Sequence, residues 1–452
     1  RACAWVQSDG IYAFFNGDQG ASLLANNTGN TNWATDATGT TDTGVLPALT
    51  DALVFGTANV TAGAKSLTLD GDLSVDSLIF NALTGVPSIA IAQGTSGILT
   101  LTPGSSANGI AVNTDAGAIT IRAPLVAAGA QTWKVVGTGS NGSSLALTGP
   151  VTFAGPITKI GAGTLTLSGA NTGSGGLNFT EGTLNLGSAS AVGSGLFQLG
   201  TGITLNNVAG AAVTLASSNA MIWKQGFTVS GNSLSFGTGA VTLTDNAAIN
   251  AAALSFTDAT FNSNARVTLA VSSTSVLSAG MPVAGTSIPF GAKIAIVANN
   301  SAFLLTSATT ATATNQTLTA YPTYSIDGVI SDAGAGLTLT KTGAGFLALG
   351  GINTFGGAGK TIDIQGGLLS VNADVALGNA ANTVTISANG ADNTGFRATE
   401  TFASARTFNL NAVNNAFTVT AGKTLTLSSP FTFGALTNNL FKSEAGTLVL
   451  SA

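Results

Sequence analysis

The sequence of 452 residues contains no histidine and a single cysteine, Cys3. Without histidine there can be no Ser-His-Asp or Cys-His catalytic pair and no histidine-based metal site. One cysteine cannot form an intrachain disulfide, so Cys3 is either an unpaired residue near a terminus or a point of cross-linking or modification. We favour the unpaired residue.

Charged residues are also scarce, at 7% of the sequence, against about 25% in an average globular protein. The 14 basic residues form no cluster and the net charge is −5, which argues against binding to nucleic acid phosphates. No run approaches the roughly 18 consecutive apolar residues of a membrane-spanning helix. Because 44% of the residues are hydrophobic, the chain also does not have the composition of a disordered protein.

What the sequence has in abundance is repetition. Residues 159–172 read KIGAGTLTLSGANT, residues 341–354 read KTGAGFLALGGINT, and residues 442–452 read KSEAGTLVLSA. In each copy, apolar residues alternate with small residues and glycines flank the run, a pattern typical of a short half-buried strand between turns. Self-similarity of this kind indicates a solenoid.

We therefore predict an all-β protein, a single-chain parallel β-helix whose turns stack about 4.8 Å apart. At 20 to 25 residues per turn, the chain would make roughly 18 to 20 turns. Asn171 and Asn353 recur at the same corner of the repeat. We expect these asparagines to satisfy backbone amides at the turns.

Two regions depart from the repeat. Residues 1–57 are rich in aromatic side chains, and we expect them to cap the open strand edges at the N-terminal end of the helix. The aromatic residues of this expected cap are Trp5, Tyr12, Phe14, Phe15 and Trp33. Residues 265–321 contain longer apolar runs and predict a small antiparallel β module inserted between turns. The β-helix then occupies residues 58–264 and 322–452, and ends in an incomplete repeat.

The repeat resembles the autotransporter-associated β-strand repeat of exported bacterial β-helix proteins, whose pattern is Lys-x-Gly-x-Gly-x-Leu-x-Leu-x-Gly followed by Asn-Thr. The first copy matches it at Lys159, Gly161, Gly163, Leu165, Leu167, Gly169, Asn171 and Thr172. The copy that begins at Lys341 matches as well, whereas the third has Ser443-Glu444 where the family has x-Gly. The opening segment NWATDATGTTDTG resembles the start of long repeat proteins of Verrucomicrobia-like bacteria.

This resemblance implies a secreted or surface-exposed bacterial protein and a right-handed helix. Autotransporters end in a membrane barrel of aromatic-girdled strands. Because the printed sequence ends within a repeat, we expect either a protein without that barrel or a fragment released from a longer one.

Candidate sites for chemistry are few. The densest acidic group is Asp70, Asp72 and Asp76 in LDGDLSVD, whose oxygens could hold Ca²⁺. The alternation of polar and apolar residues favours ordinary outward strand and turn positions, so we expect neither a metal nor a cofactor. The other acidic residues are dispersed, unlike the clustered carboxylates of polysaccharide-active enzymes. We therefore do not expect an enzyme.

Three functions remain open. We favour an extracellular structural protein, the subunit of a surface filament that stacks head-to-tail with further copies of itself. The last repeat would supply the self-association edge through Lys442, Thr447, Leu448, Val449 and Leu450. The alternative is the shaft of a cell-surface adhesin that binds a glycan or a host surface, and a polysaccharide-active enzyme is the least favoured.

Overall fold

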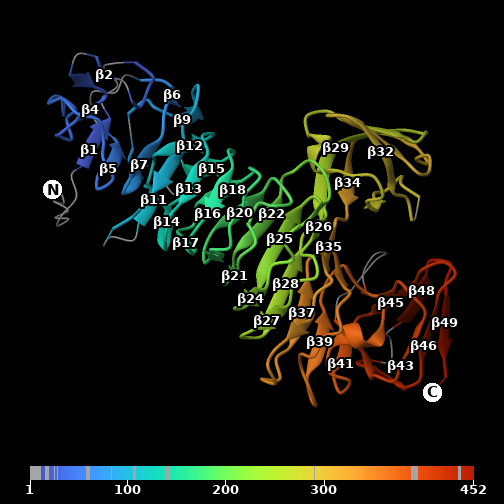
Figure 1. Ribbon diagram of the computed structural model, residues 1–452. Coiled ribbons are helices and arrows are strands. Elements are labelled where there is room, and N and C mark those ends of the chain that lie inside the picture. Colours follow the sequence, from blue (N-terminus) through green and yellow to red (C-terminus); the bar gives the residue numbers. More distant parts are fainter. Residues whose placement is uncertain are drawn as a thin grey trace. The chain divides into compact units, whose positions relative to one another are not determined.

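The computed structural model describes residues 12–15, 20–24, 26–27, 29–56, 62–82, 84–104, 108–137, 142–289, 291–387, 395–435 and 439–451. The chain divides into an N-terminal unit, Arg1–Gln198, and a C-terminal unit, Leu199–Ala452. In each unit, short strands stack along a solenoid (Figure 1). The described residues form an all-β parallel β-solenoid of about 16 turns without an α-helix, which confirms the predicted fold class. There are fewer turns than predicted because an inserted sheet removes residues from the stack.

Three rows of parallel strands build the N-terminal unit, each strand pairing with its equivalent one turn later. The first row contains β1 (Tyr12–Phe15), β5 (Ala52–Phe55), β8 (Ser77–Phe80), β11 (Asn108–Val112), β14 (Gln131–Val135), β17 (Ile157–Ile160) and β19 (Leu177–Phe179). The second row contains β6 (Lys65–Leu69), β9 (Ser88–Gln93), β12 (Gly117–Ile121), β15 (Ser143–Leu147), β18 (Thr164–Leu167) and β20 (Thr183–Leu186). The third row contains β7 (Leu73–Val75), β10 (Leu99–Leu101), β13 (Leu125–Ala127) and β16 (Val151–Phe153). Strand β21 (Phe197–Leu199) lies at the boundary of the two units.

The strand register places similar side chains directly above one another in the core. In the second row, one aliphatic column contains Ile89, Ile119, Leu145, Leu165 and Leu184. All five side chains are at most 2% exposed. Because side chains alternate between the two faces of a strand, the threonines of β18 lie half-buried on the outer side. The Leu/Thr alternation of the repeat therefore separates core from surface directly.

Aromatic side chains and an antiparallel strand cover the first turn of the N-terminal unit. Strand β4 (Trp33–Ala34) pairs antiparallel with β1, beyond the short hairpin of β2 (Asn26–Asn27) and β3 (Asn30–Thr31). Trp33 is fully buried, and its ring lies 5.6 Å from that of Phe15 and 5.8 Å from that of Phe55. The Trp33 indole N–H donates to the Leu23 carbonyl at 2.9 Å. Strands β1 and β5 themselves pair in parallel, so solenoid pairing already begins within residues 1–57.

Four rows of parallel strands build the C-terminal unit. One contains β24 (Met221–Trp223), β27 (Val241–Leu243) and β36 (Ile330–Ser331). A second contains β22 (Thr204–Asn207), β25 (Phe227–Gly231), β28 (Ala247–Ala251), β37 (Leu339–Thr342), β39 (Thr361–Ile364), β41 (Thr383–Ile386), β44 (Phe408–Leu410) and β47 (Phe431–Phe433). A third contains β23 (Val213–Thr214), β26 (Leu234–Ser235), β35 (Thr323–Ile326), β38 (Phe346–Leu349), β40 (Leu368–Val371), β42 (Gly395–Ala398), β45 (Asn414–Val419) and β48 (Asn439–Ser443). The last contains β43 (Phe402–Ser404), β46 (Thr424–Leu427) and β49 (Thr447–Leu450), and a 3-10 turn, η2 (Asp374–Leu377), follows β40.

A six-stranded antiparallel sheet, here called the inserted module, interrupts the C-terminal unit between β28 and β35 (Figure 1, yellow). It contains β29 (Leu254–Asn262), β30 (Arg266–Leu269), η1 (Thr274–Val276), β31 (Val283–Ala284), β32 (Ile294–Asn299), β33 (Ala302–Leu305) and β34 (Thr312–Ala320). Its own core includes Phe256, Phe261 and Phe303. The module begins at Leu254, among residues that the sequence analysis places in the β-helix, because β29 pairs with β34 along its length.

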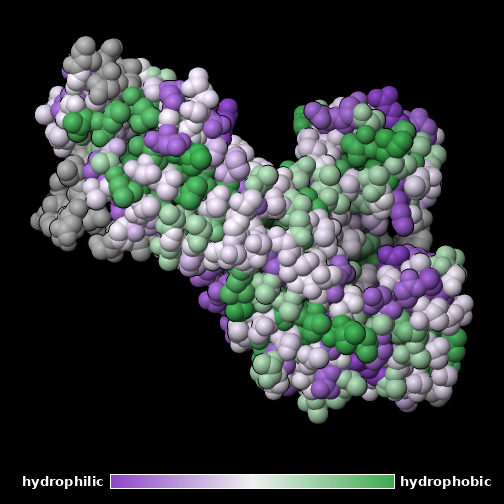
Figure 2. All heavy atoms as spheres, in the orientation of Figure 1, coloured by the Kyte–Doolittle hydropathy of each residue, from purple (hydrophilic) through white to green (hydrophobic). Residues whose placement is uncertain are grey.

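The surface reflects the scarcity of charge. Most of the visible face is of intermediate hydropathy, and the strongly hydrophilic side chains lie scattered or in small groups (Figure 2). In the part of the chain that the structure describes, no helix has the length and apolarity needed to cross a membrane.

Candidate functional site

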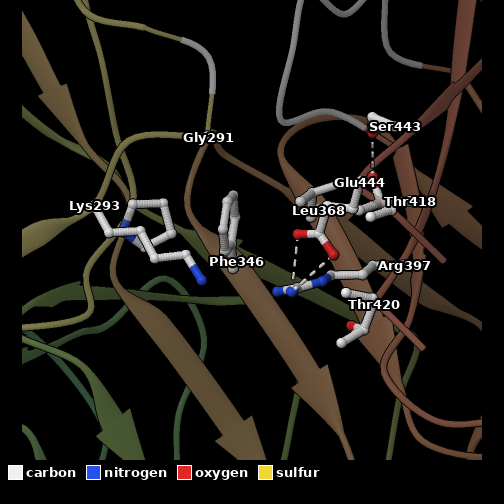
Figure 3. A pocket seen from close by; sticks show the side chains of 12 residues that line it. Gly291, Lys293, Phe346, Leu368, Arg397, Thr418, Thr420, Ser443 and Glu444 are labelled. Atoms are coloured by element: carbon white, nitrogen blue, oxygen red, sulfur yellow. Dashed lines mark hydrogen bonds and ion pairs between the residues drawn. The ribbon is translucent and has the colours of Figure 1, made fainter. Parts of the chain in front are cut away.

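A cavity of about 340 Å³ lies where the inserted module meets the outer face of the β38–β48 row. Gly291 and Lys293, just before β32, line the module side (Figure 3). On the other side, successive strands contribute Phe346, Arg397 and Thr418. We call this cavity the cleft.

The parallel register arranges the polar side chains of the cleft in one column. Arg397 of β42 pairs with Thr418 of β45, which pairs with Ser443 of β48. The Thr418 and Ser443 hydroxyls lie 2.9 Å apart. The apolar part of the wall comes from Leu368 and from Phe346, whose ring stacks on that of Tyr321 at 5.5 Å between centroids and 7° between planes. The cleft thus combines hydroxyls and charges with an apolar wall.

Three charged side chains line the cleft in a chain that has few. The Arg397 guanidinium donates from Nη2 to both oxygens of Glu444, at 2.9 and 3.2 Å. Lys293 is exposed, and its ammonium forms no ion pair with any described residue. The two cations therefore exceed the single carboxylate by one positive charge.

Glu444 has an unusual backbone conformation. Its φ of +59° lies in the left-handed region, and the equivalent residues of the other two repeats are glycines, Gly161 at +84° and Gly343 at +73°. For a non-glycine residue this conformation costs roughly 1–2 kcal/mol. A partly exposed ion pair such as that of Glu444 with Arg397 contributes only about 0–1 kcal/mol. The glutamate therefore gives the fold no net stability, and strained residues of this kind cluster at functional sites.

The first residue of the repeat is a buried lysine. Lys159 and Lys341 are both fully buried, and each ammonium donates to three backbone carbonyls. Lys159 binds the carbonyls of Gly161, Gly163 at 2.6 Å and Glu181 at 2.8 Å, the last from the following turn. Lys341 binds those of Thr342 at 2.8 Å, Gly343 at 2.6 Å and, in the following turn, Gly366 at 2.7 Å. The lysines therefore join successive turns from inside the core.

Burial changes the acidity of both lysines. It lowers the pKa of Lys341 to about 7. For Lys159, burial lowers the pKa to about 8, although the charge of Glu181 opposes the shift. The ring of Phe179 lies 5.1 Å from the Lys159 ammonium. These side chains lie in the core, away from the surface that a ligand could reach.

The asparagine of the repeat joins three turns. Asn171 accepts from the Val151 amide at 2.9 Å and donates to the Ala191 carbonyl at 2.7 Å. Asn353 makes the same two bonds, from the Ile330 amide and to the Ala376 carbonyl, both at 2.7 Å. Each asparagine therefore satisfies one backbone group in the turn before and one in the turn after.

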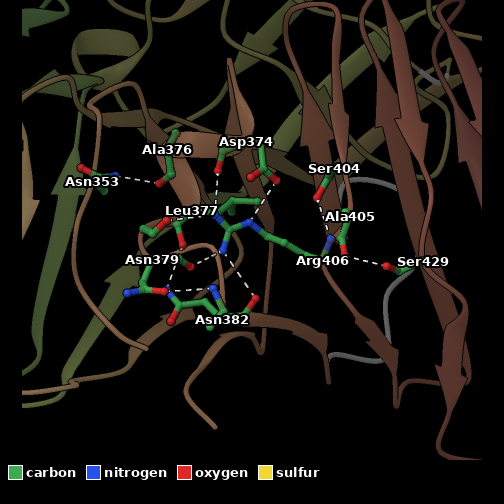
Figure 4. Close-up of polar contacts among 12 residues, drawn as sticks. Asn353, Asp374, Ala376, Leu377, Asn379, Asn382, Ser404, Ala405, Arg406 and Ser429 are labelled. Carbon is green, nitrogen blue, oxygen red and sulfur yellow. Dashed lines mark hydrogen bonds and ion pairs between the residues drawn. The ribbon is translucent and has the colours of Figure 1, made fainter. Parts of the chain in front are cut away.

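Arg406 forms a second buried polar centre, which the sequence analysis did not single out (Figure 4). Its Nε binds the Asp374 carboxylate at 2.9 Å, and the other guanidinium nitrogens bind carbonyls around η2, including those of Asn379 at 2.5 Å and Gly378 at 2.9 Å. Asn382 lies beside it and binds the carbonyls of Phe355 and Leu377, both at 3.0 Å. This network holds η2 in place.

The three aspartates proposed for Ca²⁺ bind separate protein groups. Asp70 accepts from the Thr68 hydroxyl at 3.0 Å, Asp72 from the Ile98 amide at 2.9 Å and Asp76 from the Gly104 amide at 2.6 Å. Within the described ranges, no group of three or more His, Cys, Asp or Glu side chains could hold a metal ion. Asp70 and Asp72 are exposed, whereas Asp76 is buried at 6% exposure, so it is not the outward residue that the alternation predicted.

The predicted self-association residues lie on β48 and β49, at the last strand edges of the C-terminal unit. Lys442 and Thr447 are exposed, Leu448 is half-buried, and Val449 and Leu450 are 37% and 52% exposed. Of the predicted cap residues, Phe15 and Trp33 pack in the aromatic cluster described above, and Tyr12 and Phe14 lie on β1. Trp5 and Cys3 lie outside the described residues.

Lys293, Arg397 and Arg406 were not predicted from the sequence as site residues. In a chain with so few charges, each charged residue inside a strand-rich segment is itself a signal. Lys293 and Arg397 lie far apart in the sequence, however, and only the fold of the inserted module brings them to one cavity.

Comparison with known proteins identifies the repeats. Residues 157–186 and 339–371 match the Passenger-associated-transport-repeat family. Over 83 residues the chain is 45% identical to the Adhesin BmaC autotransporter of Brucella suis biovar 1 (strain 1330). That stretch is 18% of this chain and 2% of the adhesin, so the chain spans only a small part of the adhesin's length. No solved structure matches the chain.

The two matched segments are the repeats that begin near Lys159 and Lys341, and they contain both buried lysines and both turn-joining asparagines. The repeat type and the solenoid fold fit a non-enzymatic protein. The predicted resemblance is thus confirmed: the chain is a β-solenoid that carries two passenger-associated-transport-repeats and is similar to an autotransporter adhesin.

Proposed function

We propose that this chain is part of a secreted, adhesin-like passenger at a bacterial cell surface, in which the solenoid is the shaft and the inserted module with its cleft makes the contact. The observation that supports this most directly is the cleft itself. The module departs from the shaft in fold, and its Lys293 meets Arg397 and Glu444 of the shaft in the cleft, so that three charged side chains come together there. The similarity to an adhesin and the repeat type agree with this proposal. We infer no catalytic activity, because the sequence lacks histidine and its carboxylates are dispersed.

The test is an adhesion assay with the whole chain. Its single cysteine, Cys3, allows oriented coupling to inert beads through thiol chemistry. We expect the beads to be retained on a panel of polysaccharides, matrix proteins and epithelial monolayers more strongly than beads that carry an unrelated protein. Retention should fall in a variant in which Lys293 and Arg397 are both alanine and stay unchanged in Lys224→Ala, which removes an exposed lysine elsewhere in the same unit. Equal retention of coated and control beads on every surface would end the proposal.

A head-to-tail filament is the second candidate, and its contact would be made by β48 and β49. The ammonium of Lys442 is exposed and binds the Glu444 carbonyl, whereas each buried equivalent also binds a carbonyl of the following turn. Phe433, Phe441 and Leu450 are each about half exposed around this edge, at 48%, 51% and 52%. A further turn would cover these side chains and complete the lysine site by strand addition.

Negative-stain electron microscopy and light scattering of the chain and of Leu450→Asp distinguish the two candidates. The filament requires fibres or a mass that grows with concentration in the unaltered chain, and loss of both in the variant. Single particles in both samples would exclude it.

A further inference from the structure

We propose that the cleft binds an acidic saccharide, with the ligand carboxylate at Lys293 and Arg397 and sugar hydroxyls along β45 and β48. This inference rests on the proposed adhesin-like function and names the ligand class for it. The cavity of about 340 Å³ lies at the lower end of the size range of small-molecule sites, roughly 300–1,000 Å³. A site of that size suits one or two sugar rings.

The charge of the cleft favours an anion. Lys293 projects from the module toward Arg397 on the opposite wall (Figure 3). Glu444 occupies Nη2 of Arg397 and no ion-pair partner for Lys293 exists among the described residues, so one positive charge remains uncompensated. A carboxylate between the two cations would supply the missing charge and accept charge-assisted hydrogen bonds.

The remaining wall fits a sugar better than a simple inorganic anion. Thr418 and Ser443 offer hydroxyls that can both donate and accept, as sugar hydroxyls do. They lie in the same column as Arg397, about 4.8 Å apart from strand to strand. Phe346 and Leu368 close the cavity behind these hydroxyls, each with only 3% of its surface exposed. A bare phosphate or sulfate would fill less of the cavity of about 340 Å³ than a sugar ring does.

Glu444 links the cleft to the repeat. In the other two copies this position is a glycine, and here a glutamate in a left-handed conformation orients Arg397 at no net gain in stability. Because Glu444 is itself negative, it also limits the affinity for an acid.

The test uses isothermal titration calorimetry at low salt, with digalacturonic acid and its dimethyl ester as probes, on the whole chain. The acid should bind at least 10-fold more tightly than the ester, which has the same rings without the charge. Lys293→Ala and Arg397→Ala should each weaken binding of the acid at least 10-fold, whereas Lys224→Ala leaves it unchanged. Glu444→Gln keeps the shape of the side chain and should tighten binding of the acid 3- to 10-fold without affecting the ester.

Circular dichroism of each variant first establishes that it is folded. Equal binding of acid and ester, no binding of either, or weaker binding of the acid by Glu444→Gln would overturn the inference. The outcome is separable from that of the adhesion assay. Beads that adhere without binding of the acid would remove the ligand assignment and leave the adhesin proposal intact, whereas beads that never adhere would remove the adhesin proposal whatever the calorimetry gives.

Discussion

Replacing Asn353 with alanine should loosen the C-terminal unit at one defined place. Asn353 is 4% exposed and makes two hydrogen bonds of 2.7 Å, from the Ile330 amide and to the Ala376 carbonyl. Alanine leaves both backbone groups buried without these partners. A buried polar group that loses its partner costs about 1–3 kcal/mol. Two such groups give an expected loss of about 2–6 kcal/mol in the free energy of unfolding.

Two measurements together locate the effect. Urea unfolding followed by circular dichroism gives the loss in stability, and hydrogen exchange with mass spectrometry reports on the Ile330 amide. Because about 1.4 kcal/mol corresponds to a factor of ten, that amide should exchange at least 10-fold faster in the variant. The matched control is Asn300→Ala, in which an exposed asparagine of the inserted module is replaced. If the two variants unfold at the same urea concentration, the asparagine does not hold the turns together and our explanation of the repeat is wrong.

Asn353→Asp sharpens this prediction through its pH dependence. Aspartate keeps the acceptor for the Ile330 amide but places a second oxygen against the Ala376 carbonyl. Burial and this carbonyl should raise the pKa of the new carboxyl above its unfolded value. The protonated form can donate, so the variant should recover stability as the pH falls below the raised pKa and lose it as the pH rises. Parallel pH profiles of variant and unaltered chain would contradict this.

Two further predictions concern buried charges. Burial lowers the pKa of Lys341 to about 7, whereas lysine in an unfolded chain has a pKa of about 10.4. Between these two pH values the unfolded state therefore binds more protons than the folded state. The free energy of unfolding should then rise with pH, by up to about 1.4 kcal/mol per pH unit. Lys341→Met should remove this contribution, which urea unfolding of the variant and of the unaltered chain at pH 7 and pH 9 measures. If the free energy of unfolding changes equally with pH in both, the prediction is refuted. Arg406→Met should cost about 3–5 kcal/mol because it leaves the Asp374 carboxylate and several carbonyls without their partner. The control Arg397→Met breaks a more exposed ion pair and should lower the free energy of unfolding by less than about 1 kcal/mol. Equal losses of stability in the two variants would show that burial of the ion pair does not matter.

The repeated rungs could be predicted from the sequence because their pattern is local. The alternation around Leu165 and Leu167 specifies which side chains enter the core, and the glycines mark the turns. The confirmed fold class follows from these features. The bonds of Asn171 and Asn353 were expected at a turn amide, but the second bond of each, to the following turn, depends on how turns stack.

The cleft and the edges of the inserted module could not be predicted in the same way. Strand β29 has the composition of a solenoid strand, and only its pairing with β34 assigns it to the antiparallel sheet. Lys293, Arg397 and Glu444 come together through that sheet and through the stacking of β42 on β45 and β48. A single sequence gives no measure of such long-range pairing. The aspartates at 70, 72 and 76 are near one another in the sequence, but each binds a different protein group.

The lysine that opens each repeat has a consequence for how the solenoid grows. Lys159 and Lys341 each donate one of their three hydrogen bonds to a carbonyl of the following turn. While the solenoid folds, the ammonium of the last folded turn therefore stays hydrated and positively charged at the open edge until the following turn folds onto it. An edge lysine of this kind discourages pairing with strands of other molecules. The same lysine would thus oppose aggregation at the growing end of the solenoid. Once the following turn covers it, its hydrogen bond to that turn would fix the register of the two turns.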